Sequence, residues 1–154
     1  MTTLAFILPC EADSQALAAR FARCLRAPLV LTFSGEIGAG KTTFIRAMLR
    51  ALGITSAIKS PTFSLIESYS CQNLQIHHFD LYRIHDESEL EYIGFRDYFL
   101  ADALCCIEWP ERAGKMLDCV DVHFDFALHG NGRRLTLSAL TPLGKTMLSC
   151  LKGQ

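Results

Sequence analysis

The chain has 154 residues, and its 15 Lys and Arg side chains nearly balance its 16 Asp and Glu side chains, so the formal net charge at pH 7 is -1. Half of the residues are hydrophobic and a fifth are charged, a composition that predicts one globular domain spanning residues 1–154. A near-neutral chain is not expected to coat nucleic acid or a membrane by bulk charge. Once a core of this size is built, little chain remains for a second catalytic domain.

The cysteines follow no pattern of a disulfide framework or a zinc site. Their number, 7, is odd, no C-x-x-C occurs, and Cys105 and Cys106 are adjacent. We therefore expect reduced thiols that serve as small apolar side chains in a cytoplasmic protein, and no structural metal. Glu11 and Asp13 interrupt the apolar N-terminal stretch, so neither a signal peptide nor a membrane span is expected.

The first part of the chain alternates strand and helix patterns. An apolar run at residues 4–8 predicts a strand, and helical spacing of apolar residues predicts a helix capped by Asp13 or Ser14 that ends near Arg26. The nearly unbroken apolar run 29–33 is typical of a strand buried on both faces of a parallel sheet. A glycine-rich turn follows, and then a helix over about residues 41–52 that Gly53 ends.

Strand patterns dominate the second part of the chain. Apolar or alternating runs predict strands at residues 63–69, 74–79, 103–107, 120–128 and 135–137. Short helices are expected at residues 86–92 and 95–100. The last two strands form an antiparallel hairpin with Asp121, His123 and Asp125 on its solvent face. Together these elements predict an α/β fold in which helices cover a mixed central sheet.

The strongest motif is the run from Gly35 to Thr42, which matches G-x-x-x-x-G-K-[ST] at every fixed position. Its glycines let backbone amides approach and cradle phosphate oxygens at the start of a helix. Lys41 is expected to neutralise the β and γ phosphates, and the Thr42 hydroxyl to ligate Mg²⁺. The expected nucleotide-binding residues of the loop are Glu36, Ile37, Gly38, Ala39, Gly40, Lys41, Thr42 and Thr43.

Two acids follow strand patterns, where a carboxylate can help to hold Mg²⁺ or position water. Glu108 follows the apolar run 103–107, and Asp80 follows the run 74–79. The first run is the more apolar, so Glu108 is the better candidate for the acid of a central strand. No D-x-x-G or [NT]-K-x-D motif occurs, so the sequence does not support guanine specificity.

Four short blocks, at residues 35–44, 60–63, 78–83 and 108–111, together resemble the TsaE (YjeE) family of small P-loop ATPases. The resemblance covers about residues 29–112. It implies an α/β, P-loop NTPase-like three-layer fold with a mixed central sheet and a C-terminal antiparallel hairpin. It also implies an ATP- and Mg²⁺-binding bacterial protein of the pathway that makes N6-threonylcarbamoyladenosine in tRNA next to the anticodon.

The resemblance further implies how the work is divided among proteins and residues. The transfer chemistry belongs to the partner proteins TsaD and TsaB, which bring the tRNA, while this member hydrolyses ATP so that their complex turns over. Lys41, Asp80 and Glu108 would be catalytic, with Asp80 orienting or deprotonating the attacking water. Thr42 and Glu108 would ligate Mg²⁺.

Three further residues are expected at the nucleotide. Thr62 would offer a hydroxyl in a segment, Ser60–Phe63, that senses the γ-phosphate, and Trp109 would lie near the nucleotide and the partner surface. Arg133 or Glu11 would contact adenine.

Two other functions remain open for such a loop. A small-molecule kinase would use Asp80 near Arg83 to bind an acceptor hydroxyl, although no clear lid segment is present. A non-catalytic adaptor would use ATP only to order a binding surface. His77 and His78 are adjacent on a predicted strand and should point to opposite faces, so neither is expected to bind a metal.

Overall fold

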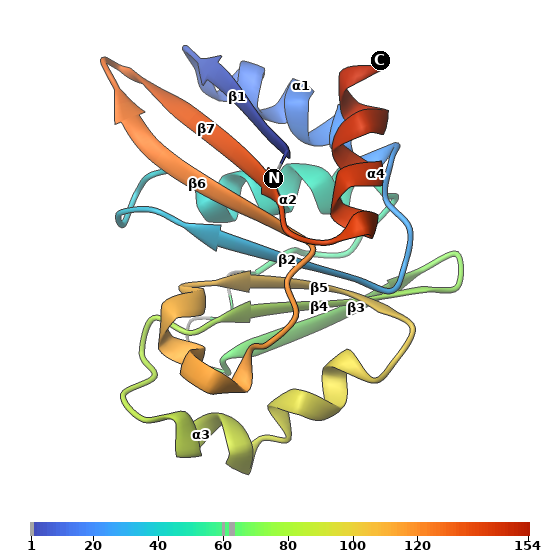
Figure 1. The fold of residues 1–154 in the computed structure, drawn as a ribbon, viewed down its shortest axis with the longest axis vertical. Coiled ribbons are helices and arrows are strands. Elements are labelled where there is room, and N and C mark those ends of the chain that lie inside the picture. Colours follow the sequence, from blue (N-terminus) through green and yellow to red (C-terminus); the bar gives the residue numbers. More distant parts are fainter. Residues whose placement is uncertain (1, 60, 62–63) are drawn as a thin grey trace.

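In the computed structural model, which describes residues 2–59, 61 and 64–154, one seven-stranded mixed sheet runs through the chain (Figure 1). The strands are β1 (Thr2–Leu8), β2 (Leu29–Ser34), β3 (Ile66–Cys71), β4 (Leu74–Asp80), β5 (Ala103–Glu108), β6 (Val122–His129) and β7 (Gly132–Ala139). The helices are α1 (Glu11–Ala22), α2 (Lys41–Ala51), α3 (Glu87–Tyr92) and α4 (Pro142–Lys152), with 3₁₀ helices η1 (Phe95–Phe99) and η2 (Pro110–Met116). Within these ranges, no helix is both long enough and apolar enough to cross a bilayer.

The strand order β1-β7-β6-β2-β5-β4-β3 puts the parallel strands at the centre and antiparallel pairs at both edges, β1 with β7 and β3 with β4. β2 pairs in parallel with both β5 and β6, and β4 pairs in parallel with β5. The β3–β4 and β6–β7 pairs are antiparallel. The predicted α/β fold, with its mixed central sheet and C-terminal hairpin, is therefore confirmed. The carboxyl ends of β2, β4 and β5 meet at one edge, where ligands bind in open α/β sheets.

Two hydrophobic clusters fill the layers on the two faces of the sheet. On one face, α1, α2 and α4 contribute Phe21, Phe44 and Leu148 to a cluster with β2, β6 and β7. On the other face, the segment that contains α3, η1 and η2 packs against Phe79 and Ile107 of β4 and β5, and this segment lies below the sheet in Figure 1. The structure is thus built of three layers, and both faces of the central strands are buried.

Phe124 of β6 is the aromatic centre of the first cluster. Its ring lies 4.5 Å from that of Phe33, 5.2 Å from that of Phe21 and 5.3 Å from that of Phe44, measured between centroids. We expect Phe124→Ala to lower the free energy of unfolding by about 3–5 kcal/mol, because it leaves a cavity among these rings. Urea unfolding measures the change. The matched control is Leu128→Ala on the same strand, whose side chain is 60% exposed and should change stability by less than about 0.5 kcal/mol.

The predicted first helix was wrong at both of its ends. α1 begins at Glu11, and Asp13, expected as its cap, lies in its first turn and accepts the Cys10 N–H at 3.1 Å. The helix ends at Ala22, with Arg23 as its C-cap, because the amides of Cys24 and Leu25 bond to carbonyls only three residues back. Helix α4 was not predicted at all, although Thr141 caps it by accepting the Gly144 N–H and Pro142 opens it.

The expectation that every cysteine is a free thiol was wrong for two of them. Cys24, just after α1, forms a disulfide with Cys150 of α4 across a sequence separation of 126 residues. The pairing could not be expected without α4, whose C-terminal half lies against the end of α1. Cys105 and Cys106 are buried free thiols that fill the core as expected, and burial raises the pKa of Cys105 to about 12.

The predicted solvent face of the last hairpin was also wrong in part. Asp125 is exposed and His123 is half-buried, but Asp121 is buried and accepts hydrogen bonds from the Val30 amide and the Thr141 hydroxyl. The physical reason is that β6 joins β2 in the middle of the sheet and α4 begins beside it, so the start of this hairpin has neighbours on both sides.

Candidate nucleotide site at the phosphate loop

The loop between β2 and α2 has the backbone geometry that its glycines predict. Gly35, Gly38 and Gly40 have φ of 145°, 80° and 104°, a region that side chains with a Cβ disfavour. A Cβ on Gly35 would also lie 2.6 Å from the carbonyl oxygen of Phe126 in β6. No side chain caps α2, which begins at Lys41. Its first amides are therefore free to bind an anion.

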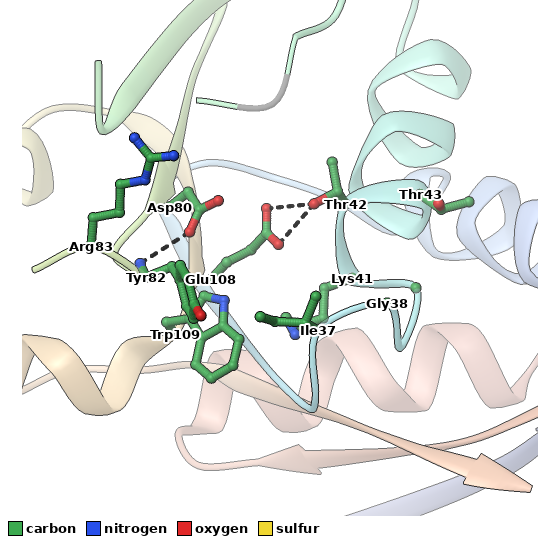
Figure 2. Close-up of a pocket in the computed structure, with 11 residues that line it drawn as sticks. Ile37, Gly38, Lys41, Thr42, Thr43, Asp80, Tyr82, Arg83, Glu108 and Trp109 are labelled. Carbon is green, nitrogen blue, oxygen red and sulfur yellow. Dashed lines mark hydrogen bonds between the residues drawn. The ribbon is translucent and has the colours of Figure 1, made fainter. Parts of the chain in front are cut away.

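Most of the predicted site residues line one cavity of about 390 Å³ (Figure 2). They are Ile37, Gly38, Gly40, Lys41, Thr42, Thr43, Asp80, Glu108 and Trp109, and the structure adds Tyr82 and Arg83. Glu36 is absent from this lining but offers its backbone carbonyl to Lys41 at 3.0 Å. Thr62 lies outside the described residues, as do Ser60 and Phe63 of the same block.

Lys41 crosses the loop from the first turn of α2. Its side-chain Nζ donates to the carbonyls of Gly35, at 2.5 Å, and Glu36, and it lies 4.4 Å from the centre of the Trp109 ring. Burial lowers the pKa of this ammonium, while the negative charges of Glu108, Asp80 and Glu111 oppose the change. The cation is thus fixed at the loop by the backbone and by an aromatic face.

Glu108 is the last residue of β5 and is only 2% exposed. The Thr42 hydroxyl donates to its two carboxylate oxygens at 2.9 and 3.1 Å, and His78 Nε2 lies 2.6 Å from Oε2. A hydroxyl and a carboxylate are hard oxygen donors of the kind that Mg²⁺ prefers. The residues at this point therefore fit a magnesium ion bound together with phosphate.

Asp80 ends β4 and is the register partner of Glu108 on β5, so the two acids share one face and one edge of the sheet. Figure 2 shows their carboxylates facing the same space, with Thr42 beyond Glu108. Burial raises the pKa of Asp80, the Tyr82 N–H that it accepts at 3.1 Å lowers it, and the charge of Glu108 raises it again. Asp80 is thus a carboxylate with a raised proton affinity beside the candidate metal ligand.

Trp109 follows Glu108 with φ of 59°, which turns the chain sharply out of β5 and into η2. Non-glycine residues rarely adopt this left-handed conformation, and those that do are often found at functional sites. The turn brings the indole over Lys41 and within 5.0 Å of the Tyr82 ring. Sequence reasoning missed Tyr82, although it lies in the same block as Asp80.

Arg133 of β7 lies on the other side of the loop. It donates to the carbonyls of Gly38 at 2.9 Å and Ala39 at 3.0 Å. It also lines a second cavity, of about 210 Å³, with Glu11, Ala39 and Asn131, and this cavity shares Gly38, Gly40 and Thr43 with the first. The loop is therefore a wall between two cavities. One contains Asp80 and Glu108, and the other lies between α1 and the C-terminal hairpin.

Comparisons with known proteins agree with this geometry. The family model "Threonylcarbamoyl adenosine biosynthesis protein TsaE" matches residues 8–137. A "tRNA threonylcarbamoyladenosine biosynthesis protein TsaE" from Haemophilus influenzae is 41% identical over 121 residues, which are 79% of this chain and 77% of that protein. The protein of the same name from Aquifex aeolicus is 38% identical over 108 residues, which are 69% of this chain and 76% of that protein.

The fold gives an independent comparison. The crystal structure of Bacillus subtilis YdiB superposes with a TM-score of 0.85 and 25% sequence identity, over 99% of this chain and 95% of that chain. The span of the family model begins at Leu8 and ends at Leu137. It therefore includes the loop, the two acids that end β4 and β5, and the arginine that holds the loop. The chain belongs to the TsaE family.

Proposed function

We propose that the chain binds ATP with Mg²⁺ and hydrolyses it as part of the machinery that makes N6-threonylcarbamoyladenosine in tRNA. The observation that carries this proposal is the meeting of Thr42, Glu108 and Asp80 at the end of a glycine-rich phosphate loop. The names of the relatives support the pathway. Residues 1–154 would act as one ATPase domain in the cytoplasm.

The residues of the phosphate loop and the two acids have distinct tasks in this proposal. The loop amides and Lys41 hold the phosphates, and Thr42 and Glu108 hold the ion. When bound, Mg²⁺ would neutralise part of the negative charge of the phosphates. Asp80 orients the attacking water and accepts its proton, a task that its raised pKa favours. Thr62 would respond to the γ-phosphate.

The second cavity is the candidate site for the base. It lies on the opposite side of Gly38 and Gly40 from the acids, and its walls carry the polar side chains of Glu11, Asn131 and Arg133. A nucleotide with its phosphates in the loop would therefore direct its base toward α1 and the C-terminal hairpin. We propose that Arg133 acts mainly by fixing the loop carbonyls.

Replacing Arg133 tests this role. Arg133→Met keeps an unbranched side chain but loses the hydrogen bonds to Gly38 and Ala39, so nucleotide affinity should fall by about tenfold or more, since a charge-assisted bond contributes about 1.5–3 kcal/mol. Arg134→Met is the matched control, because the adjacent Arg134 is exposed. Calorimetric titration with ADP measures both. Equal affinities in the two variants would contradict the role of Arg133.

We propose TsaD and TsaB as the protein partners, with tRNA reached indirectly through their complex. Exposed apolar side chains at the first cavity support a protein contact there. Ile37 is 70% exposed and Tyr82 is 41% exposed. Both flank the proposed phosphate site, so a partner seated on them would sense the state of the nucleotide.

The test combines binding and hydrolysis. Trp109 is the only tryptophan and contacts Lys41, so its fluorescence should change when ATP and Mg²⁺ are added. Phosphate release is then measured with and without TsaB and TsaD, and is expected to rise with the partners. Absence of an ATP-dependent signal in every mixture would overturn the proposal. ADP formation that depends on one metabolite would indicate a kinase, and bound ATP that stays intact for hours would indicate an adaptor.

A further inference from the structure

His78 is a buried residue of the site that the metal-binding scheme above does not use. It lies two positions before Asp80 on β4, so its side chain points to the same face of the sheet as Asp80 and Glu108. Its side chain is 0% exposed, and its Nε2 lies 2.6 Å from Glu108 Oε2. The neighbouring His77 points to the opposite face, where its ring contacts Tyr98.

The second ring nitrogen of His78 indicates which atom carries the proton. Nδ1 is the one buried side-chain nitrogen or oxygen without a hydrogen-bond partner among the described residues. A proton on Nδ1 would leave a buried N–H unpaired, which costs more than an unpaired lone pair on a neutral ring. The favoured form therefore carries its proton on Nε2 and donates it to Glu108.

This arrangement holds the Glu108 carboxylate from two directions. The Thr42 hydroxyl from α2 donates to both of its oxygens, and the imidazole from β4 donates to Oε2. Two donors from different elements fix the plane of the carboxylate and the direction of its oxygens. Outer partners of this kind commonly orient the ligands of protein-bound metals.

We infer that His78 is a positioning residue for the proposed magnesium ligand Glu108. By holding that carboxylate, His78 sets the affinity of the bound nucleotide for Mg²⁺ without contacting the ion. The inference rests on the proposed function. His78 is not assigned to the ion itself, because its Nε2 faces the Glu108 carboxylate and Mg²⁺ prefers oxygen donors.

The experiment titrates MgCl₂ into the protein with saturating ADP, and follows Trp109 fluorescence. In His78→Leu, the concentration of Mg²⁺ at half-saturation should rise by about 10–100-fold, the usual effect of losing an outer partner. His78→Gln should stay within about threefold of the unsubstituted chain, because its amide nitrogen occupies the position of Nε2. His78→Asn, whose amide is one bond shorter, should resemble His78→Leu. ADP affinity in EDTA should not change in any of them.

The controls separate positioning from a general loss of structure. His77→Leu, on the same strand but facing the other side, should leave the Mg²⁺ midpoint unchanged. The inference is overturned if His78→Leu keeps the midpoint of the unsubstituted chain, or if the Gln and Leu variants behave alike. It is also overturned if ADP affinity in EDTA falls as much as the affinity for Mg²⁺. An unsubstituted chain that binds no ADP would overturn the proposed function itself, together with this inference.

Discussion

Replacing Lys41 with methionine is expected to lower nucleotide affinity on the order of 100-fold, because each charge-assisted bond from the ammonium to phosphate contributes about 1.5–3 kcal/mol. Methionine keeps the unbranched stem that packs near Trp109, so the loss is one of charge and hydrogen bonds. The fold should persist, since among residues 2–59, 61 and 64–154 the Lys41 ammonium donates hydrogen bonds only to the loop carbonyls of Gly35 and Glu36. Calorimetric titration with ADP and Mg²⁺ measures the affinity, and circular dichroism monitors the fold.

The control for Lys41 is a lysine on the surface. Lys145 of α4 is exposed and lines neither cavity, so Lys145→Met should bind ADP as the unsubstituted chain does. If Lys41→Met retained full affinity, the phosphates would have to be held by backbone amides alone. The role proposed for the lysine would then be wrong.

Asp80→Asn should reduce the hydrolysis rate by about 10²–10⁴-fold, the usual contribution of a general base, and leave nucleotide binding nearly unchanged. Asparagine has the same shape, and its amide oxygen can still accept the Tyr82 N–H that Asp80 accepts. It cannot take a proton from water. Single-turnover release of phosphate from bound ATP, with the partner proteins present, measures the rate.

A second aspartate provides the comparison for Asp80. Asp102 lies immediately before β5, at the opposite end of this strand from Glu108, and is exposed, so Asp102→Asn should hydrolyse ATP at the normal rate. A normal rate in Asp80→Asn would contradict the proposed role of Asp80. A loss of binding in that variant would instead mean that the carboxylate supports the metal site.

The phosphate loop and the two acids could be predicted, because each depends on a short run of neighbouring residues. Gly35 to Thr42 predicts its own turn, because each glycine is needed where the backbone has positive φ. Asp80 and Glu108 could be found because each follows a strand pattern, and parallel strands place their carboxyl ends together. Their roles stay predictions, but their meeting at one edge of the sheet follows from the pattern.

The remainder depends on contacts between distant parts of the chain. His78 was not expected to bind a metal and was given no other role. Its spacing of two residues from Asp80 was nevertheless the signal that both side chains lie on the same face of the strand. The contacts of Arg133 with the loop span 94 and 95 residues, and local pattern carries no information about them. The Cys24–Cys150 pair was missed for the same reason, because it depends on where α4 returns.

The register of the C-terminal hairpin determines which side chain supports the loop. Arg133 shares its face of β7 with Leu135 and Leu137, both fully buried, while Arg134 points the opposite way. A slip of β7 by a single residue would expose both leucines and exchange the two arginines. Burial of Leu135 and Leu137 therefore fixes the register of β7. The same register places the Arg133 side chain, rather than that of Arg134, at the phosphate loop.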